Sequence, residues 1–136
     1  MEHWNCKPLI SVGKIEFGMN QESVKKLFYP LEFTIRKYGL YNQKIHDYGD
    51  FQVYYAADDT VEAVEICRNI EVLLYDRILF PAPIEIITRQ ISGFQKKAQN
   101  YLQADLSIEL YTNNGKLMSI LIGRKGFFIS HFYTTA

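Results

Sequence analysis

The chain has 136 residues, with 15 basic and 15 acidic side chains and a formal net charge of zero. This length suffices for one domain with a hydrophobic core and is short for two. The hydrophobic fraction of 48% and the charged fraction of 22% exclude a disordered chain. The balanced charge argues against a general nucleic-acid binder, which normally carries a basic excess.

Cysteine content and hydropathy set the expected compartment. Only Cys6 and Cys67 are present, whereas a secreted disulfide scaffold of this size usually has more. The N-terminus lacks the basic segment and apolar run of a signal peptide. No apolar run approaches the roughly 20 residues that span a bilayer. We therefore expect a cytoplasmic protein with reduced thiols and no membrane partner.

The first elements in chain order are a strand and a short helix. Residues 9–17 look like an extended entry strand with an interruption at Gly13, and Gly18 then turns the chain. Asn20 is a plausible N-cap for the helix, and Pro30 stops it because proline cannot continue the hydrogen-bond pattern. Residues 31–50 are a long excursion rich in turn-formers, within which 33–38 could be a strand.

A hairpin and a helical region follow this excursion. Residues 51–55 and 61–66 form the predicted hairpin around a polar turn. After a strand between 70 and 80, the isoleucine spacing predicts a helix from Ala82 to about Ile91 that ends at Gly93. Residues 94–103 are expected to form a second, more polar helix.

The C-terminal part contains a second hairpin, at 107–111 and 116–122, joined through Asn113-Asn114-Gly115. Asn-Gly is a strong turn signal because both residues tolerate positive φ. Residues 127–133 are expected to be a final strand with apolar groups on both faces.

The two hairpins repeat one another at a constant offset, which places Tyr55 on Tyr111 and Val64 on Ile120. The first copy carries Glu62 and Glu65 where the second carries Met118 and Leu121. We predict a single α+β domain, 1–136, built from a pseudo-duplicated helix-plus-hairpin unit at about 9–68 and 70–133. It should contain a mainly antiparallel sheet of about six to eight strands, with two or three helices on one face.

The sequence contains no arrangement typical of a catalytic or metal site. His46-Asp47 is isolated, and His3 with Cys6 lacks the further ligands that a structural zinc site needs. No serine lies in a nucleophile-elbow context, and no glycine-rich loop precedes a helix. We therefore expect a non-catalytic protein with no cofactor.

One charge pattern stands out around the first hairpin, where the stretch from Asp47 to Glu65 contains no Lys or Arg. A solvated hairpin with its approach loop is one interpretation. The other is an acidic, tyrosine-bearing surface that binds a basic protein partner, because such a surface steers association and sets specificity. The candidate partner-binding residues are Asp47, Asp50, Tyr54, Asp58, Asp59, Glu62 and Glu65.

Residues 15–67 resemble a module of small bacterial immunity-type proteins from polymorphic toxin and contact-dependent inhibition systems. The resemblance rests on Ile15 to Pro30, a strand followed by Gly18-Met19 and a short helix. It continues in Val53-Tyr54-Tyr55 with the strand from Val61 to Ile66. The expected Leu-Gly at the helix end is replaced by Phe28-Tyr29.

The resemblance implies a protein that neutralises a cognate toxin by direct binding, often through acidic groups. Two alternatives remain open. One is an enzyme or small-ligand binder with a pocket between the sheet and residues 31–50, lined by His46 and tyrosines. The other is a structural homo-oligomer that buries its Tyr and Phe surface.

Overall fold

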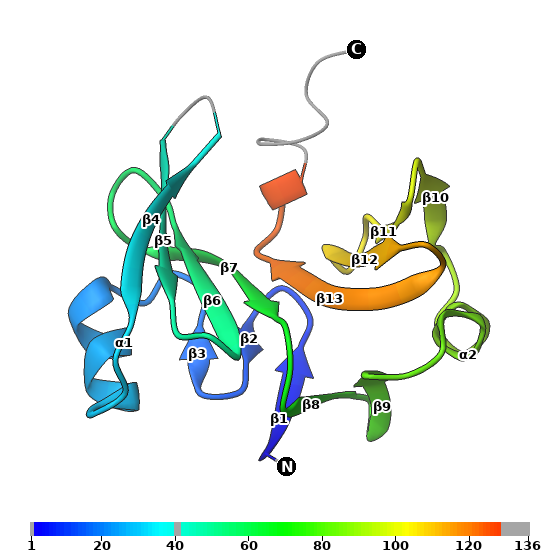
Figure 1. Ribbon diagram of the computed structural model, residues 1–136, viewed down its shortest axis with the longest axis horizontal. Helices are drawn as coiled ribbons and strands as arrows, with labels where there is room; N and C mark the ends of the chain where they lie inside the picture. The colour runs from blue at the N-terminus through cyan, green and yellow to red at the C-terminus, as the bar shows by residue number, and fades with distance from the viewer. Residues whose placement is uncertain (1, 40–41, 129–136) are drawn as a thin grey trace.

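A computed structural model describes residues 2–39 and 42–128 of the chain. The protein is a single α+β domain in which antiparallel pairing dominates, as the sequence predicts. The strands form two sheets, and the two helices flank the smaller sheet at opposite sides of the molecule (Figure 1). No helix in the described part of the chain is long and apolar enough to cross a bilayer.

The larger sheet has eight antiparallel strands in the order β10-β11-β12-β13-β7-β6-β5-β4. Its two ends rise as arms on either side of residues 124–128 (Figure 1). The strand bounds are β4 Thr34–Tyr38, β5 Gln43–Asp47, β6 Phe51–Tyr55, β7 Val61–Ile66, β10 Gln95–Lys97, β11 Asn100–Gln103, β12 Ile108–Asn113 and β13 Lys116–Gly123.

The smaller sheet has five strands in the order β3-β2-β1-β8-β9. Strands β1 and β8 pair in parallel, with Trp4 opposite Val72, and the other pairs are antiparallel. The sequence did not predict this second sheet, because two of its strands are only two residues long. The bounds are β1 Glu2–Lys7, β2 Ser11–Val12, β3 Ile15–Glu16, β8 Ile70–Leu74 and β9 Arg77–Phe80.

Both helices have the expected local signals. Helix α1 spans Gln21–Phe28, and the Asn20 side chain accepts a hydrogen bond from the Ser23 backbone N–H at 2.9 Å. This bond caps the helix, as the sequence predicts. Helix α2 spans Ile84–Gln90 and buries Ile87. Its C-cap is Ile91, two residues before the predicted Gly93.

The two faces of the larger sheet have different environments, because side chains alternate along each strand. One face packs on the smaller sheet and forms the main core, which includes Val53, Val64 and Ile120. The other, concave face carries a second cluster in which Phe127 and Phe128 pack on Tyr54 and Leu121. Residues 124–128 therefore cover part of the concave face.

The repeat in the sequence appears as a mirrored strand order about the β7–β13 pair. Across this pair Val64 lies opposite Ile122, and Ile66 lies opposite Ile120. Each hairpin also has a β-bulge at the corresponding place, where the strand register skips Glu62 in β7 and Met118 in β13. Tyr54, rather than Tyr55, therefore corresponds to Tyr111 in the structure. The sequence alignment that matches β7 with β13 must be shifted by a single position to match β6 with β12.

Three local predictions were wrong or lie partly outside the described residues. Residues 94–103 contain β10 and β11 instead of a polar helix. The entry strand expected at 9–17 is interrupted at Gly13, as predicted, but its two parts are only two residues long each. Phe127 and Phe128 have helical backbone, and the rest of the predicted strand 127–133 lies outside the described residues.

Candidate functional site

A row of polar side chains crosses the concave face of the larger sheet. The strand pairing places five residues side by side, and we call them the acidic row: Asp47, Gln52, Glu65, Leu121 and Glu109. Paired residues project from the same face of a sheet. The row therefore brings together three half-buried carboxylates, two from the first half of the chain and one from the second.

Glu65 lies at the centre of the acidic row and is held by two hydroxyl groups. The Tyr54 hydroxyl donates to Glu65 Oε1 at 2.8 Å, and the Ser119 hydroxyl donates to Oε2 at 2.7 Å. Both donors are buried. Burial and the adjacent carboxylate raise the pKa of Tyr54 far above its usual value, so this hydroxyl stays protonated and keeps donating. Glu65 is thus a fixed acceptor in the sheet.

Asp47 lies at the β4 end of the acidic row, where its charge is matched by a basic side chain. Arg36 Nε lies 3.3 Å from Asp47 Oδ2, and the Arg36 guanidinium also donates to the Gln52 side-chain oxygen. Asp47 Oδ1 accepts the Gly49 backbone N–H at 2.8 Å. Arg36 therefore offsets the charge of Asp47 at this end of the row.

The tip of the first hairpin holds three further predicted residues. Asp58 and Asp59 are exposed, and Glu62 is only 1% exposed. Asp58 accepts the Thr60 hydroxyl at 2.6 Å and the Thr60 N–H at 3.2 Å, and these bonds lower its pKa. Asp58 therefore orders the turn and stays ionised.

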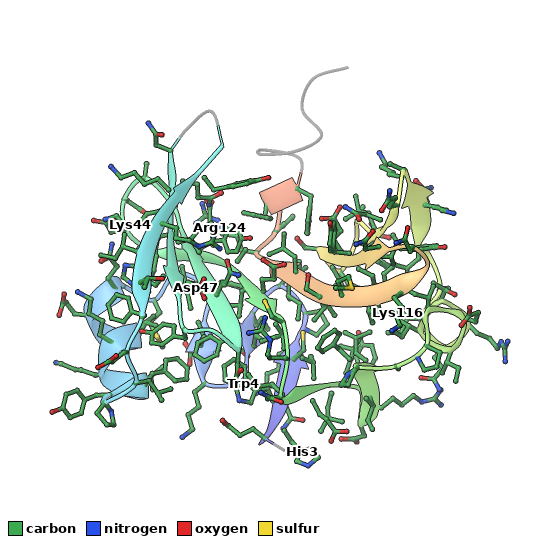
Figure 2. The ribbon with its side chains drawn as sticks, in the orientation of Figure 1. His3, Trp4, Lys44, Asp47, Lys116 and Arg124 are labelled. Atoms are coloured by element: carbon green, nitrogen blue, oxygen red, sulfur yellow. The ribbon has the colours of Figure 1, made fainter. Side chains whose placement is uncertain are left out.

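Basic residues from neighbouring elements approach the other two carboxylates of this tip. Lys44 Nζ lies 3.0 Å from Asp59, and Arg124 lies 3.9 Å from Glu62. Figure 2 shows Lys44 on one arm and Arg124 between the two arms. The stretch without Lys or Arg in the sequence therefore does not correspond to an unpaired acidic surface.

Asp50 lies apart from both groups, in the turn between β5 and β6. Its side chain accepts from the Asn69 amide at 3.2 Å, and its backbone oxygen accepts from Cys67 N–H at 2.9 Å. The structure therefore brings Asp47, Tyr54 and Glu65 together on the concave face. It places Asp58, Asp59 and Glu62 at the hairpin tip and leaves Asp50 at a separate turn.

His46 is fully buried between the rings of Phe33 and Tyr55, at centroid distances of 4.5 and 4.6 Å. Burial, with help from Lys25 and Lys44, lowers the pKa of His46 to about 4. Residues 34–38 and 43–47 are strands of the sheet rather than a layer above it. His46 therefore packs in the interior, and the cavity of about 420 Å³ in this region is lined by Lys44 and Tyr55 rather than by His46.

Burial keeps both cysteines in the thiol form. Burial raises the pKa of Cys6 to about 12 and of Cys67 to about 11, so neither is a thiolate at neutral pH. Across residues 2–39 and 42–128, no group of three or more His, Cys, Asp or Glu side chains gathers closely enough to hold a metal ion.

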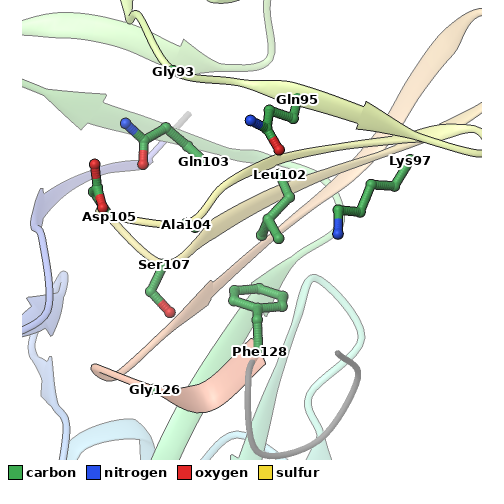
Figure 3. Close-up of a pocket in the computed structure, with 10 residues that line it drawn as sticks. All are labelled: Gly93, Gln95, Lys97, Leu102, Gln103, Ala104, Asp105, Ser107, Gly126 and Phe128. Atoms are coloured by element: carbon green, nitrogen blue, oxygen red, sulfur yellow. The ribbon is translucent and has the colours of Figure 1, made fainter. Parts of the chain in front are cut away.

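A cavity of about 470 Å³ lies beside the acidic row, between the β10–β11 hairpin and Phe128 (Figure 3). Leu102 is among the residues that line it, and the Gln103 and Ser107 side chains in its wall bond within the protein. The Gln103 side chain donates to the Ser92 carbonyl at 3.0 Å and accepts the Leu106 N–H at 2.9 Å. Gln103 therefore fixes the surrounding loops.

Sequence reasoning missed Glu109 and Tyr111, which come from the second hairpin. Glu109 pairs with Leu121 in the sheet and accepts from the Asn100 amide at 3.4 Å. Tyr111 is 46% exposed and lies two residues further along the same face. The signal was available in the repeat, since a twofold sheet places Glu109 where the first half has Gln52.

No protein-family model, curated protein sequence or solved structure matches this chain.

Proposed function

We propose that this chain is a non-catalytic binding protein of the immunity type, which neutralises a cognate bacterial toxin by direct contact. The observation that carries the proposal is the acidic row on the concave face, where Asp47, Glu65 and Glu109 share one line across the sheet. A concave acidic surface attracts a basic partner and guides its orientation.

Two features of the site favour binding over chemistry. Glu65 is held by two protonated hydroxyls and Asp47 by a guanidinium, so both carboxylates serve as fixed negative charges. Tyr111 offers an exposed aromatic ring on the same face, and tyrosine is enriched among the residues that anchor protein interfaces. The partner we infer is a basic surface of the toxin.

Co-expression tests the proposal. The toxin is sought as the product of the gene immediately upstream, and its toxicity is measured in cells with and without this chain. We expect protection and a complex that co-purifies. Tyr111→Ala should weaken the complex at least about tenfold, and Ile86→Ala, a matched change of an exposed residue on α2, should not. Absence of both complex and protection would refute the proposal.

A further inference from the structure

Strand β4 ends the larger sheet, and its outer edge is open. It pairs with β5 along its whole length, from Thr34 opposite Asp47 to Tyr38 opposite Gln43. All five of its residues are exposed. Within residues 2–39 and 42–128, no other strand pairs with it. An open edge strand is a template for pairing with another extended segment.

The alternation of hydrogen-bonded and non-hydrogen-bonded residue pairs shows which backbone groups of β4 face away from the sheet. The Tyr48 N–H donates to the Phe51 carbonyl at 2.9 Å, which makes this a hydrogen-bonded pair. Such pairs alternate along antiparallel strands, so Ile45 and Asp47 direct their backbone groups toward β4. The backbone groups of their partners on β4, Arg36 and Thr34, therefore bond to β5. The N–H and C=O groups of Ile35 and Lys37 therefore point away from the sheet.

The side chains around this edge are apolar and basic. Two exposed large hydrophobic residues lie on β4 itself, Ile35 at 62% and Tyr38 at 57% exposure. Residues 21–44 carry five Lys or Arg and two Asp or Glu. Arg36 is paired with Asp47, whereas Lys37 makes no ion pair among the described residues. The edge thus offers one uncommitted positive charge beside apolar surface.

We propose that the outer edge of β4 binds an extended acidic segment of the partner protein as a ninth strand of the larger sheet. Ile35 and Lys37 project from the same face, two residues apart. The incoming strand therefore carries an apolar side chain opposite Ile35 and a carboxylate opposite Lys37. This inference rests on the proposed protein-binding function, but it concerns a surface separate from the acidic row.

Lys37 also makes the edge selective. A lysine on an open edge disfavours pairing with basic strands, and opposite charges across a strand pair stabilise it. Two copies of β4 that pair about their centre would place Arg36 opposite Arg36, which is unfavourable. The edge is therefore better suited to an acidic segment of another protein than to a second copy of this chain.

A peptide titration followed by amide NMR tests the inference without the toxin. The probe is an extended peptide of about nine residues, with Val and Glu two positions apart among threonines. The control peptide has Lys in place of Glu. We expect shifts centred on the Ile35 and Lys37 amides, and binding of the Lys peptide at least about fivefold weaker. Equal binding of the two peptides, or shifts centred elsewhere, would overturn the inference.

Two variants at position 37 distinguish the contribution of the backbone N–H to peptide binding from that of the lysine side chain. Lys37→Pro removes an outward N–H that the fold does not use, so it should abolish peptide binding while the remaining amide spectrum is preserved. Lys37→Ala keeps the N–H, so it should retain binding and lose the preference for Glu. Undiminished binding by Lys37→Pro would overturn the inference. So would a concentration-dependent dimer in light scattering that Lys37→Pro abolishes.

The outcomes also distinguish this inference from the proposed function. If a toxin complex forms but the peptide does not bind at β4, only the edge inference fails. If the peptide binds as described but no toxin is neutralised, the proposed function fails and the edge site remains.

Discussion

Glu65 and Leu121 lie directly opposite each other on β7 and β13, where the two halves of the larger sheet meet. They occupy corresponding positions in the two hairpins, at the same offset that places Val64 on Ile120. The pseudo-twofold axis therefore passes between a carboxylate and a leucine. The same backbone position carries a charge in one half and a core contact in the other, so the duplication provides the scaffold and its asymmetry provides the site.

Replacing Glu65 with leucine should destabilise the protein, although it makes the pair more symmetric. The buried hydroxyls of Tyr54 and Ser119 would lose their common acceptor. We expect Glu65→Leu to lower the free energy of unfolding by about 2–4 kcal/mol. Urea denaturation measures this, with Glu85→Leu on the exposed side of α2 as the control. A change as small as the control's would show that these bonds contribute little.

His46 should make stability fall as the pH falls. Its pKa is lowered to about 4 in the folded protein, so below its ordinary value of 6.5 the unfolded chain takes up a proton more readily. The stability present above pH 6.5 is therefore lost as the pH falls toward 4, at about 1.4 kcal/mol per pH unit.

Chemical denaturation at pH 7.5 and pH 5 checks this dependence. Between these two pH values the free energy of unfolding of the wild type should fall by about 2 kcal/mol through His46, and that of a His46→Phe variant should not show this fall. Identical pH dependence in His46→Phe and the wild type would rule out this role for the buried imidazole.

Gly123 is needed for the cover over the concave face. A Cβ at this position would lie 2.7 Å from the Phe127 Cβ, closer than non-bonded carbons approach. We expect Gly123→Ala to displace Phe127 from Tyr54 and to destabilise the fold by about 1–3 kcal/mol. Thermal unfolding measures the change, and Lys125→Ala in the exposed part of the same turn is the control. An unchanged melting temperature would contradict this packing.

The open edge of β4 predicts an alternating pattern of amide exchange in the free protein. The Arg36 N–H is bonded to β5, whereas those of Ile35 and Lys37 face solvent. We expect the Arg36 amide to exchange at least about tenfold more slowly than its two neighbours. Hydrogen exchange followed by NMR gives these rates directly. Protection of Ile35 and Lys37 in the free protein would mean that another part of the chain covers this edge.

The hairpins could be predicted from the sequence because their signals are local. Asn114 and Gly115 have φ values of 52° and 78°, as the Asn-Gly turn requires. Asn20 caps α1 in the same local manner. Strand β10 gave no such signal, because Gln95–Lys97 is polar and fully exposed and is a strand only through its pairing with β11.

The site was predicted in part for the same reason. Asp47, Tyr54 and Glu65 stand close together in sequence. Asp47 is paired with Arg36 and Glu65 with Ser119, and both partners come from segments that strand pairing brings near. The acidic stretch therefore looked less compensated in the sequence than it is in the fold. Glu109 was missed because it lies in the half of the chain whose hairpin is otherwise apolar.

The most direct test of the proposed binding surface is the affinity of the toxin for a variant of this protein that lacks one charge of the acidic row. Glu109→Gln removes one charge from the acidic row and keeps the shape of the side chain. The control, Glu85→Gln, removes one charge from α2 in the same way. We expect the first to weaken the complex about three- to tenfold at low salt, mostly through a slower association rate, and the second to leave it unchanged. Equal affinities for the two variants and the wild type would contradict the claim that the acidic row binds the partner.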